Sequence, residues 1–475
     1  MGSALPSAAA FFSLVLLICA LSADAFAASA RNSPAAAVTG ARQQWHSFLG
    51  RSIRTTAALK AVENSITVTS TPPSWDDLSA ALHAADTVDS PKKPLVTLYR
   101  DTNGWCPFCE RIWLVLRAKG IPYDEQLISL QNKPEWYKAL VPSTLVPAVL
   151  FHGEEGKNER RIVWESSDIL AALDEEFPDT PQMEFDTPEY KAAVQMNEDL
   201  GAAGFGFVYA GRNDTLTEED KLDRRNKFIA ELDRLNAALE AQQTGDGGLF
   251  RLGKDFTAVD ALMMPTLERW RYQLPLTTDI DILEGRPALK TWFSAMDSFE
   301  PYANRVAGDE YSWTATNSMF LRYFGGGEDK PEVAAAIKRA DDAAESLSSL
   351  FAENAVKEEV GKPYSTEAAA KLVTNHEAVI KDCTRDDPKS QQNVGRASNS
   401  DAADTMLRYV ASLLLSDDDT VLHAKEALLL DVENKESAKD AATAARTVAS
   451  RLCVPRDMSA PAASILRAAL AIVAD

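Results

Sequence analysis

The sequence is poor in histidine and cysteine, with five residues of each among 475. The histidines are scattered and show no HxxH or HExxH spacing, which argues against a zinc site built on histidine. The cysteines do not form a disulfide framework either, because Cys19 lies in an apolar leader and Cys383 and Cys453 are far apart. The informative cysteines are Cys106 and Cys109, and we expect no metal.

Basic residues are also scarce relative to acidic ones. Lysine and arginine number 49 against 70 aspartates and glutamates, which gives a net charge of −21. Nucleic acids and anionic membrane surfaces are bound through a basic footprint. The charge therefore predicts neither a nucleic-acid partner nor a stable membrane association, and the length is typical of two or three globular domains.

The longest apolar run, Ala8–Leu21, is too short to cross a membrane and is followed by the small residues of "SADAFAA". We interpret residues 1–25 as a signal peptide, although the only positive charge before the run is the amino terminus. A short N-terminal anchor is the alternative. Positions 26–60 contain arginine, serine and alanine but no acidic residue, which is typical of a transit peptide. The tandem resembles the bipartite plastid-targeting leader of algae, so we expect a soluble mature protein in the plastid.

Residues 26–90 are assigned to the transit peptide and a linker, with one short helix predicted at Trp75–Ala85. Residues 91–180 then alternate strand and helix patterns. The runs "LVTLY", "YDEQLIS", "PAVLFHG" and "RIVW" read as strands, and helices are expected after Cys106, in "KPEWYKAL" and from Ser166, which would cap the last one. This order predicts an α/β domain with a mixed sheet in a thioredoxin-like pattern.

Positions 186–310 lose the strand signals and predict an all-helical second domain. Within it, Thr257 and Asp260 have the spacing of a capping box, and we interpret them as folding residues. Glycines at 325–327 suggest a hinge, and residues 328–475 are predicted to form a further helical extension. The fold class is therefore α/β plus all-α.

Cys106 is expected at the N-cap of a helix, where unpaired backbone N–H groups and the helix dipole favour a thiolate. Pro107 suits the first helical position, and Cys109 lies one turn away, within reach of a disulfide. Half of a zinc site and an inert buried pair are the alternatives. A strand-to-helix turn that exposes the first sulfur favours a reactive thiol site.

The segments "CPFCERIWLVLRAKGI", "LQNKPEWY", "LVPAVL", "VWESSDILAALDEEFP" and "FTAVDALMMP" occur in this order. Together they resemble the landmarks of glutathione transferases, closest to the omega class and the cysteine-dependent plant classes, over about residues 95–300. The resemblance implies that Cys106 is the catalytic cysteine, which forms a mixed disulfide with glutathione. It also implies that Val146 precedes a cis-proline, Pro147, and pairs through its backbone with glutathione.

By the same resemblance, Glu165 and Ser166 hold the γ-glutamyl end of glutathione and Lys133 is a further glutathione contact. A helix N-terminus is a ready carboxylate site, and a glutamate can hold the ligand's ammonium group. Each assignment has a plainer alternative, in which Ser166 only caps its helix, Pro147 only forms a turn and Lys133 is only a solvated charge.

Two features depart from the omega pattern. Cys109 stands where that class has alanine, which leaves a glutaredoxin-like dithiol cycle open beside a monothiol cycle. The segments from about residue 289 onward are similar to a helical extension of plastid transferase-like proteins of plants and algae.

The resemblance implies a glutathione-dependent thiol transferase or reductase that acts on a small-molecule or protein disulfide or on dehydroascorbate. Glutathione would be the cosubstrate, and a homodimer would fit the family. Conjugation is less favoured, since that chemistry usually activates glutathione with a serine or tyrosine hydroxyl where this chain has Cys106. The alternative is a non-catalytic ligand carrier or scaffold with the transferase fold.

Overall fold

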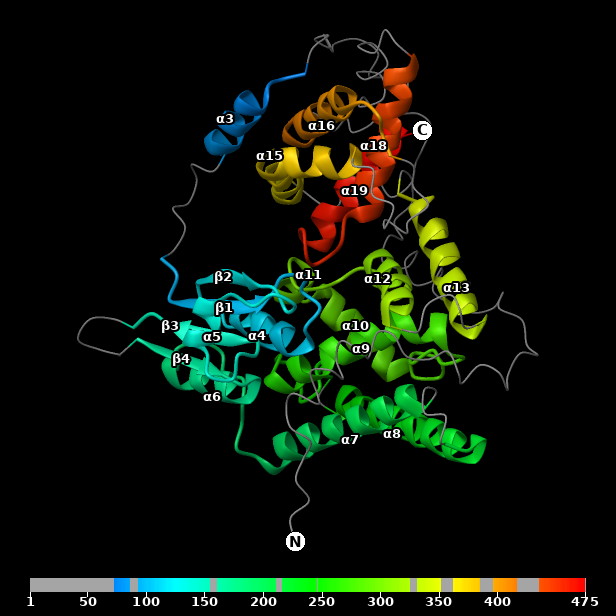
Figure 1. Cartoon of the computed structure of the whole chain (residues 1–475). Helices are drawn as coiled ribbons and strands as arrows, with labels where there is room; N and C mark the ends of the chain where they lie inside the picture. The colour runs from blue at the N-terminus through cyan, green and yellow to red at the C-terminus, as the bar shows by residue number, and fades with distance from the viewer. Residues whose placement is uncertain are drawn as a thin grey trace. The chain divides into compact units, whose positions relative to one another are not determined.

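The computed structural model describes residues 72–85, 93–153, 160–210, 216–245, 247–324, 331–351, 362–384, 396–416 and 435–474. The expected signal peptide and transit peptide lie outside the described residues. Within those ranges, the helices are too short or too polar to cross a bilayer. The chain divides into two compact units (Figure 1): the first includes 89–348 and 453–461, and the second includes 28–88, 349–452 and 462–475.

In the described part of the chain, four strands form one sheet in the order β2-β1-β3-β4. The pair β1–β2 is parallel, whereas β1–β3 and β3–β4 are antiparallel. Apolar and β-branched runs bounded by turn residues produce these strands, and the mixed sheet predicted from them is confirmed. The strands are β1 Val96–Asp101, β2 Tyr123–Ile128, β3 Ala148–Phe151 and β4 Arg161–Trp164.

The two faces of the sheet are covered by different helices. Val96 and Leu98 of β1 pack into the core cluster that includes residues of α4 (Pro107–Ala118) and α6 (Ser166–Glu176). Tyr99, one residue on, packs into a second cluster with Tyr137 of α5 (Glu135–Leu140). Successive strand side chains point to opposite faces, so β1 contributes to both layers. The result is the predicted thioredoxin-like domain.

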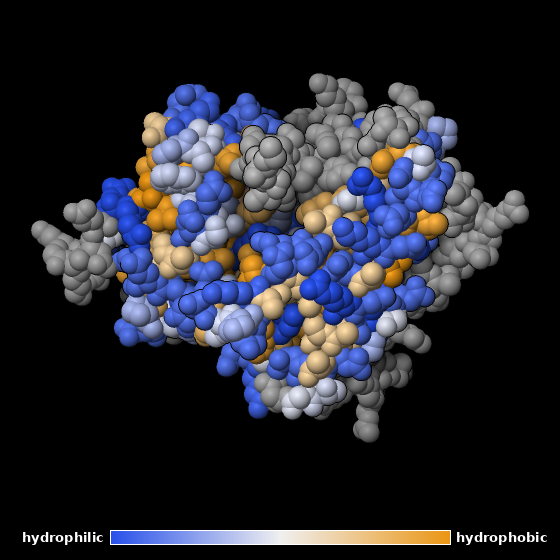
Figure 2. Space-filling view, turned by 90° about the horizontal axis from the view of Figure 1, so that it is seen from below, coloured by the Kyte–Doolittle hydropathy of each residue, from blue (hydrophilic) through white to orange (hydrophobic). Residues whose placement is uncertain are grey.

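The rest of the first unit is helical. The capping box at the start of α9 is confirmed: the backbone N–H of Thr257 donates to Asp260 Oδ2 at 3.0 Å, and the Asp260 side chain is fully buried. One face of the molecule, shown in Figure 2, is mostly hydrophilic with separate hydrophobic patches. The helices are α7 Pro188–Ala210, α8 Glu218–Gly245, α9 Ala258–Thr277, α10 Pro287–Ser298, α11 Glu300–Ala303, α12 Glu310–Phe324 and α13 Pro331–Ser348.

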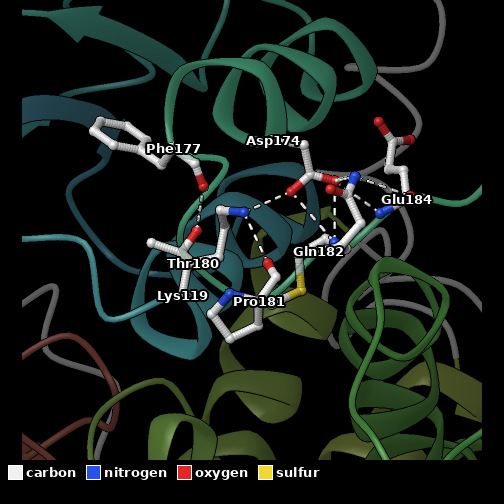
Figure 3. Close-up of polar contacts among 8 residues, drawn as sticks. Lys119, Asp174, Phe177, Thr180, Pro181, Gln182 and Glu184 are labelled. Carbon is white, nitrogen blue, oxygen red and sulfur yellow. Dashed lines mark hydrogen bonds and ion pairs between the residues drawn. The ribbon is translucent and has the colours of Figure 1, made fainter.

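The connection from the sheet domain to the helices is fixed by Asp174 of α6 (Figure 3). Lys119, just after α4, donates from Nζ to Asp174 Oδ1 at 2.6 Å and to the carbonyl of Pro181 at 2.8 Å. Gln182 and the backbone N–H of Glu184 donate to Asp174 Oδ2 at 2.6 and 2.8 Å. One buried carboxylate thus ties the segment after α6 to the end of α4.

The second unit consists of helices from distant parts of the sequence. The helix predicted at Trp75–Ala85 is present as α3, and it packs within this unit: Trp75 Nε1 donates to Asp404 at 2.7 Å, and its ring stacks on His376. Part of the expected linker is therefore a packed helix. The other helices are α15 Lys362–Thr384, α16 Ser400–Leu415, α18 Lys435–Arg451 and α19 Ala460–Ala474.

The division into units differs from the boundary expected at residue 328. Helix α13 belongs to the first unit, where Val333 and Ile337 form a cluster with Leu321 of α12 and Arg322 pairs with Asp341. The segment Cys453–Pro461 also belongs to the first unit. The expected limits of the domains otherwise stay predictions.

Candidate active site

Cys106 lies at the turn between β1 and α4, and it is the N-cap of the helix as predicted. Pro107 occupies the first helical position, where its missing N–H leaves no hydrogen bond unmade. Asp101, the last residue of β1, accepts the backbone N–H groups of Trp105 at 2.8 Å and of Cys106 at 3.2 Å. Gly104 supplies the positive φ of +68° that the turn needs. These contacts set the place of the Cys106 backbone.

Sequence reasoning missed Asp101. The signal was present in "DTNGWC", because an aspartate that precedes a turn commonly accepts backbone N–H groups a few residues on. Its burial, with 1% of its surface exposed, is a property of the fold.

Cys106 and Cys109 lie side by side and are both buried, with 3% and 1% of their surfaces exposed, so the exposed first sulfur expected from the sequence is not observed. Thiol sulfurs of the two cysteines and a carboxylate oxygen of Asp101 all lie within 4.8 Å of one another, and the cysteines of the described residues are free thiols. Burial raises the pKa of Cys109 well above its ordinary value, and the hydrogen bond and charge of Cys106 raise it further. Cys109 is therefore a neutral thiol near neutral pH.

The segment before β3 faces the cysteine. The peptide bond between Val146 and Pro147 is cis, and the carbonyl oxygen of Val146 lies 4.0 Å from Cys106 Sγ. Ala148 pairs with Trp164 of β4 and with Tyr99 of β1. These are the last residue pairs of the β1–β3 and β3–β4 ladders. The start of β3 and the end of β4 therefore lie at the same edge of the sheet as the end of β1, which leads to Cys106.

Glu165 and Ser166 follow β4 at this same edge. The structure makes Glu165 the N-cap of α6, with φ +69°, and Ser166 the first helical residue. The prediction that Ser166 caps the helix is therefore wrong, since the chain turns one residue earlier. The Glu165 side chain is exposed and makes no capping hydrogen bond. The helix thus presents its N-terminal amides without a capping carboxylate, which is an arrangement suited to an anionic group.

Lys133 lies in the turn before α5 and is half-buried. Burial lowers the pKa of Lys133, and the charge of Cys106 opposes this effect. The binding roles of Lys133, Val146, Glu165 and Ser166 stay predictions.

A buried, hydrogen-bonded pair of side chains supports the cysteine turn from the helical domain. Arg269 of α9 donates to the carbonyl of Trp105 at 2.9 Å and to Glu110 of α4 at 2.8 Å, and its guanidinium lies over the ring of Trp313. Burial raises the pKa of Glu110 to about 8, although Arg269 acts in the opposite direction. Sequence reasoning missed this pair, because charged residues in a helix are expected on the exposed face.

Comparison with known proteins supports the resemblance. Residues 105–176 match the description "Glutathione S-transferase, N-terminal domain", and residues 218–295 match "Glutathione S-transferase, C-terminal domain". Glutathione S-transferase DHAR2 of Arabidopsis thaliana is 30% identical over 210 residues, which are 44% of this chain and 88% of that protein. The chain belongs to the glutathione S-transferase family. Glutathione is accordingly its cosubstrate, and the chain is a glutathione-dependent enzyme.

Other family members cover a similar share of the chain. The chloroplastic glutathione S-transferase DHAR3 of Arabidopsis thaliana is 28% identical over 207 residues, 44% of this chain and 71% of that protein. The crystal structure of Chlamydomonas reinhardtii dehydroascorbate reductase aligns with 53% of this chain and 100% of its own, at 16% identity and a TM-score of 0.36. Residues 296–475 lie beyond the two matched family domains.

Proposed function

We propose that this glutathione S-transferase is a thiol transferase or reductase of the cysteine type, with Cys106 as its nucleophile. The observation that carries the proposal is the position of Cys106: its sulfur is at a helix N-terminus and faces the Val146 carbonyl, at the edge of the sheet where β3 begins and β4 ends. Cysteines at helix N-termini are commonly the reactive ones, because the helix dipole stabilises negative charge at that end.

In the proposed reaction, the Cys106 thiolate attacks the glutathione sulfur of a mixed disulfide. A new S–S bond joins Cys106 to glutathione, the old S–S bond breaks, and the substrate leaves as a thiolate that takes a proton from water. The thiolate of a second glutathione then attacks the bound glutathione sulfur, which releases oxidised glutathione and restores Cys106. Dehydroascorbate, reduced by two electrons and two protons at the expense of two glutathiones, is a second candidate substrate.

Glutathione would be held by the residues at the same edge. The Val146 backbone before Pro147 would pair with the cysteinyl backbone of glutathione. The N-terminal amides of α6 at Ser166 suit the γ-glutamyl carboxylate, and the exposed Glu165 suits its ammonium group. Lys133, in the turn before α5, would be a further contact of the same ligand.

The two cysteines differ in a way that favours the monothiol cycle. Cys109 would have to lose its proton to resolve the mixed disulfide, and its raised pKa opposes that step. We therefore expect Cys106→Ser to abolish reduction of a glutathione mixed disulfide and Cys109→Ser to retain it. Full activity of Cys106→Ser would refute the assignment, and loss in Cys109→Ser alone would transfer the mechanism to the dithiol cycle.

The alternative function is that of a carrier or scaffold with the transferase fold. One further measurement distinguishes it from an enzyme. Retention on immobilised glutathione is expected in both cases. Turnover of a mixed disulfide by the retained protein is expected only of the enzyme, so binding without turnover would favour the carrier.

We propose that the mature protein acts in the plastid. The sequence pattern of residues 1–60 supports this, as does the likeness to relatives that are themselves named chloroplastic. Mass spectrometry of the native protein should find a terminus near residue 60, and an intact N-terminus would contradict the proposal.

A homodimer, also proposed, is tested by light scattering of the purified chain.

A further inference from the structure

A short piece of the C-terminal extension belongs to the catalytic unit. The segment Cys453–Pro461, between α18 and α19, lies in the first unit, whereas the residues on both sides of it belong to the second. It is the red segment that passes beside α11 in Figure 1. Cys453, Val454 and Met458 are buried, with 8%, 1% and 2% of their surfaces exposed. A segment so thoroughly buried has a defined place in the fold.

The segment has a fixed shape of its own. The backbone N–H of Cys453 donates to Asp457 Oδ2 at 2.8 Å, and the backbone N–H of Asp457 returns a hydrogen bond to the carbonyl of Cys453 at 2.9 Å. Arg456 pairs with the same carboxylate at 2.7 Å. These bonds close a tight loop with Pro455 inside it, so the proline is presented by a rigid support.

Pro455 lies against the turn that leads to the catalytic cysteine. A Cβ atom placed on Gly104 would be 3.0 Å from Pro455 Cγ, which is tighter than an ordinary contact. Gly104 is two residues before Cys106, within the turn whose later amides are bound by Asp101. The proline ring therefore restricts the one part of this turn that has glycine's backbone freedom.

Two further bonds hold the segment in this place. The backbone N–H of Val454 donates to Ser312 Oγ of α12 at 2.9 Å. Arg305 donates to the carbonyl of Pro455 at 2.8 Å, and its guanidinium lies 4.4 Å from the centre of the Trp113 ring in α4. Arg305 thus links the segment to the helix whose N-terminus is Cys106, and the segment touches both the turn and its helix support.

We propose that the loop Cys453–Asp457 is a positioning element for Cys106, with Pro455 and Ser312 as positioning residues. By restricting the turn at Gly104, the segment holds the Cys106 sulfur at the N-terminus of α4, and the reaction consequently depends on the extension. The inference rests on the proposed function in taking Cys106 as the reacting thiol. It assigns a role to a part of the chain that lies beyond the two matched transferase domains.

The test uses the full chain with Pro455→Ala, which removes the ring, and Ser312→Ala, which removes the acceptor of the Val454 N–H. Pro461→Ala is the matched control, because it makes the same substitution at the other end of the segment, in the first turn of α19, where proline and alanine both fit. Three quantities are measured: kcat and KM for glutathione with a mixed disulfide, and the rate at which iodoacetamide alkylates Cys106, followed by mass spectrometry across pH 5–9.

We expect Pro455→Ala to lower kcat by about tenfold, because small displacements of a reacting group can cost up to about a hundredfold in rate. The KM for glutathione should stay within about twofold, since the proposed glutathione residues lie elsewhere. Alkylation of Cys106 at pH 6 should also slow, as the sulfur leaves the helix N-terminus. Ser312→Ala should change the same quantities in the same direction, and Pro461→Ala should leave them unchanged.

Unchanged kcat and alkylation in both Pro455→Ala and Ser312→Ala would overturn the proposal, as would an equal loss in Pro461→Ala. If Pro455→Ala fails to fold, Ser312→Ala decides by the same criteria. Alkylation needs no turnover, so a wild-type chain without thiol transfer would refute the proposed function while the alkylation comparison still tests the positioning.

Discussion

The two units differ in what they bury. The first unit holds a series of buried charged side chains, among them Arg100, Glu110, Lys119, Asp174 and Arg269. In the described residues of the second unit, Arg467 is the one charged side chain that is buried, and the helices pack through alanines and aliphatic residues. Buried charges cost desolvation free energy and are retained where they are paired.

The two units are therefore stabilised by different kinds of contact. In the second unit, polar contacts such as the Asn399 cap lie at the surface of helices that pack through small apolar residues. In the first unit, buried charged side chains fasten particular loops: Arg269 holds the carbonyl of Trp105 beside Cys106, and Asp174 holds the crossing between the two transferase domains. We infer that the buried charges of the first unit hold the site in one geometry, and that their desolvation lowers the free energy of unfolding.

The largest effect is expected at Arg269. Arg269→Met should lower the free energy of unfolding by about 3–5 kcal/mol, because the Glu110 carboxyl and the Trp105 carbonyl, both buried acceptors, lose their donor at a cost of about 1–3 kcal/mol each. Arg234→Met is the control, since Arg234 is 48% exposed and its ion pairs contribute about 0–1 kcal/mol. Urea unfolding of the two variants measures the difference, and equal losses would remove the distinction between buried and exposed pairs.

The next effect is expected at the domain crossing. Asp174→Asn should cost about 2–3 kcal/mol, as hydrogen bonds to the charged carboxylate are lost and Lys119 stays buried without its counter-charge. Glu175→Gln, on the adjacent exposed position of α6, should be nearly neutral. Thermal unfolding of both variants tests this, and a neutral Asp174→Asn would show that the crossing is held by packing alone.

Much of the sheet domain could be predicted from the sequence, because its signals are local. Each strand is an apolar run bounded by turn residues, and the helix after Cys106 begins at a proline suited to its first position. The error at Ser166 was also local: the hydroxyl suggested a cap, whereas the positive φ of Glu165 begins the helix one residue earlier.

The hydrogen bonds that hold the cysteine turn in place could not be predicted, because they join residues that are distant in the sequence. Arg269 and Trp105 are 164 positions apart, and Arg305 and Pro455 are 150 apart. A periodic pattern shows that a helix has a buried face but not which charged partner will meet it there. The packing of α3 within the second unit is a similar case, since its helix was predicted from its own sequence and its contact with Asp404 was not.

The pH dependence of stability sharpens the same comparison. Burial raises the pKa of Glu110 from 4.5 to about 8, so the folded chain keeps a proton that the unfolded chain loses. The contribution of this proton to the free energy of unfolding is complete below about pH 4.5 and is lost as the pH rises to about 8. The free energy of unfolding falls over this range by no more than about 1.4 kcal/mol per pH unit. Glu110→Gln cannot ionise, so its free energy of unfolding should change less between pH 5.5 and 8. A constant difference from the wild-type chain over this range would contradict the assignment.

The smallest effect is expected in the second unit, at the start of α16. The Asn399 side chain accepts the backbone N–H groups of Asp401 at 2.9 Å and Ala402 at 3.1 Å. Asn399→Ala leaves both donors to water and should cost about 1 kcal/mol, as is usual for an N-cap. Because this cap fastens only its own helix, kcat and Cys106 alkylation should equal those of the wild-type chain. A loss of Cys106 reactivity in Asn399→Ala would mean that the second unit acts on the site as a whole and not through the loop Cys453–Asp457 alone.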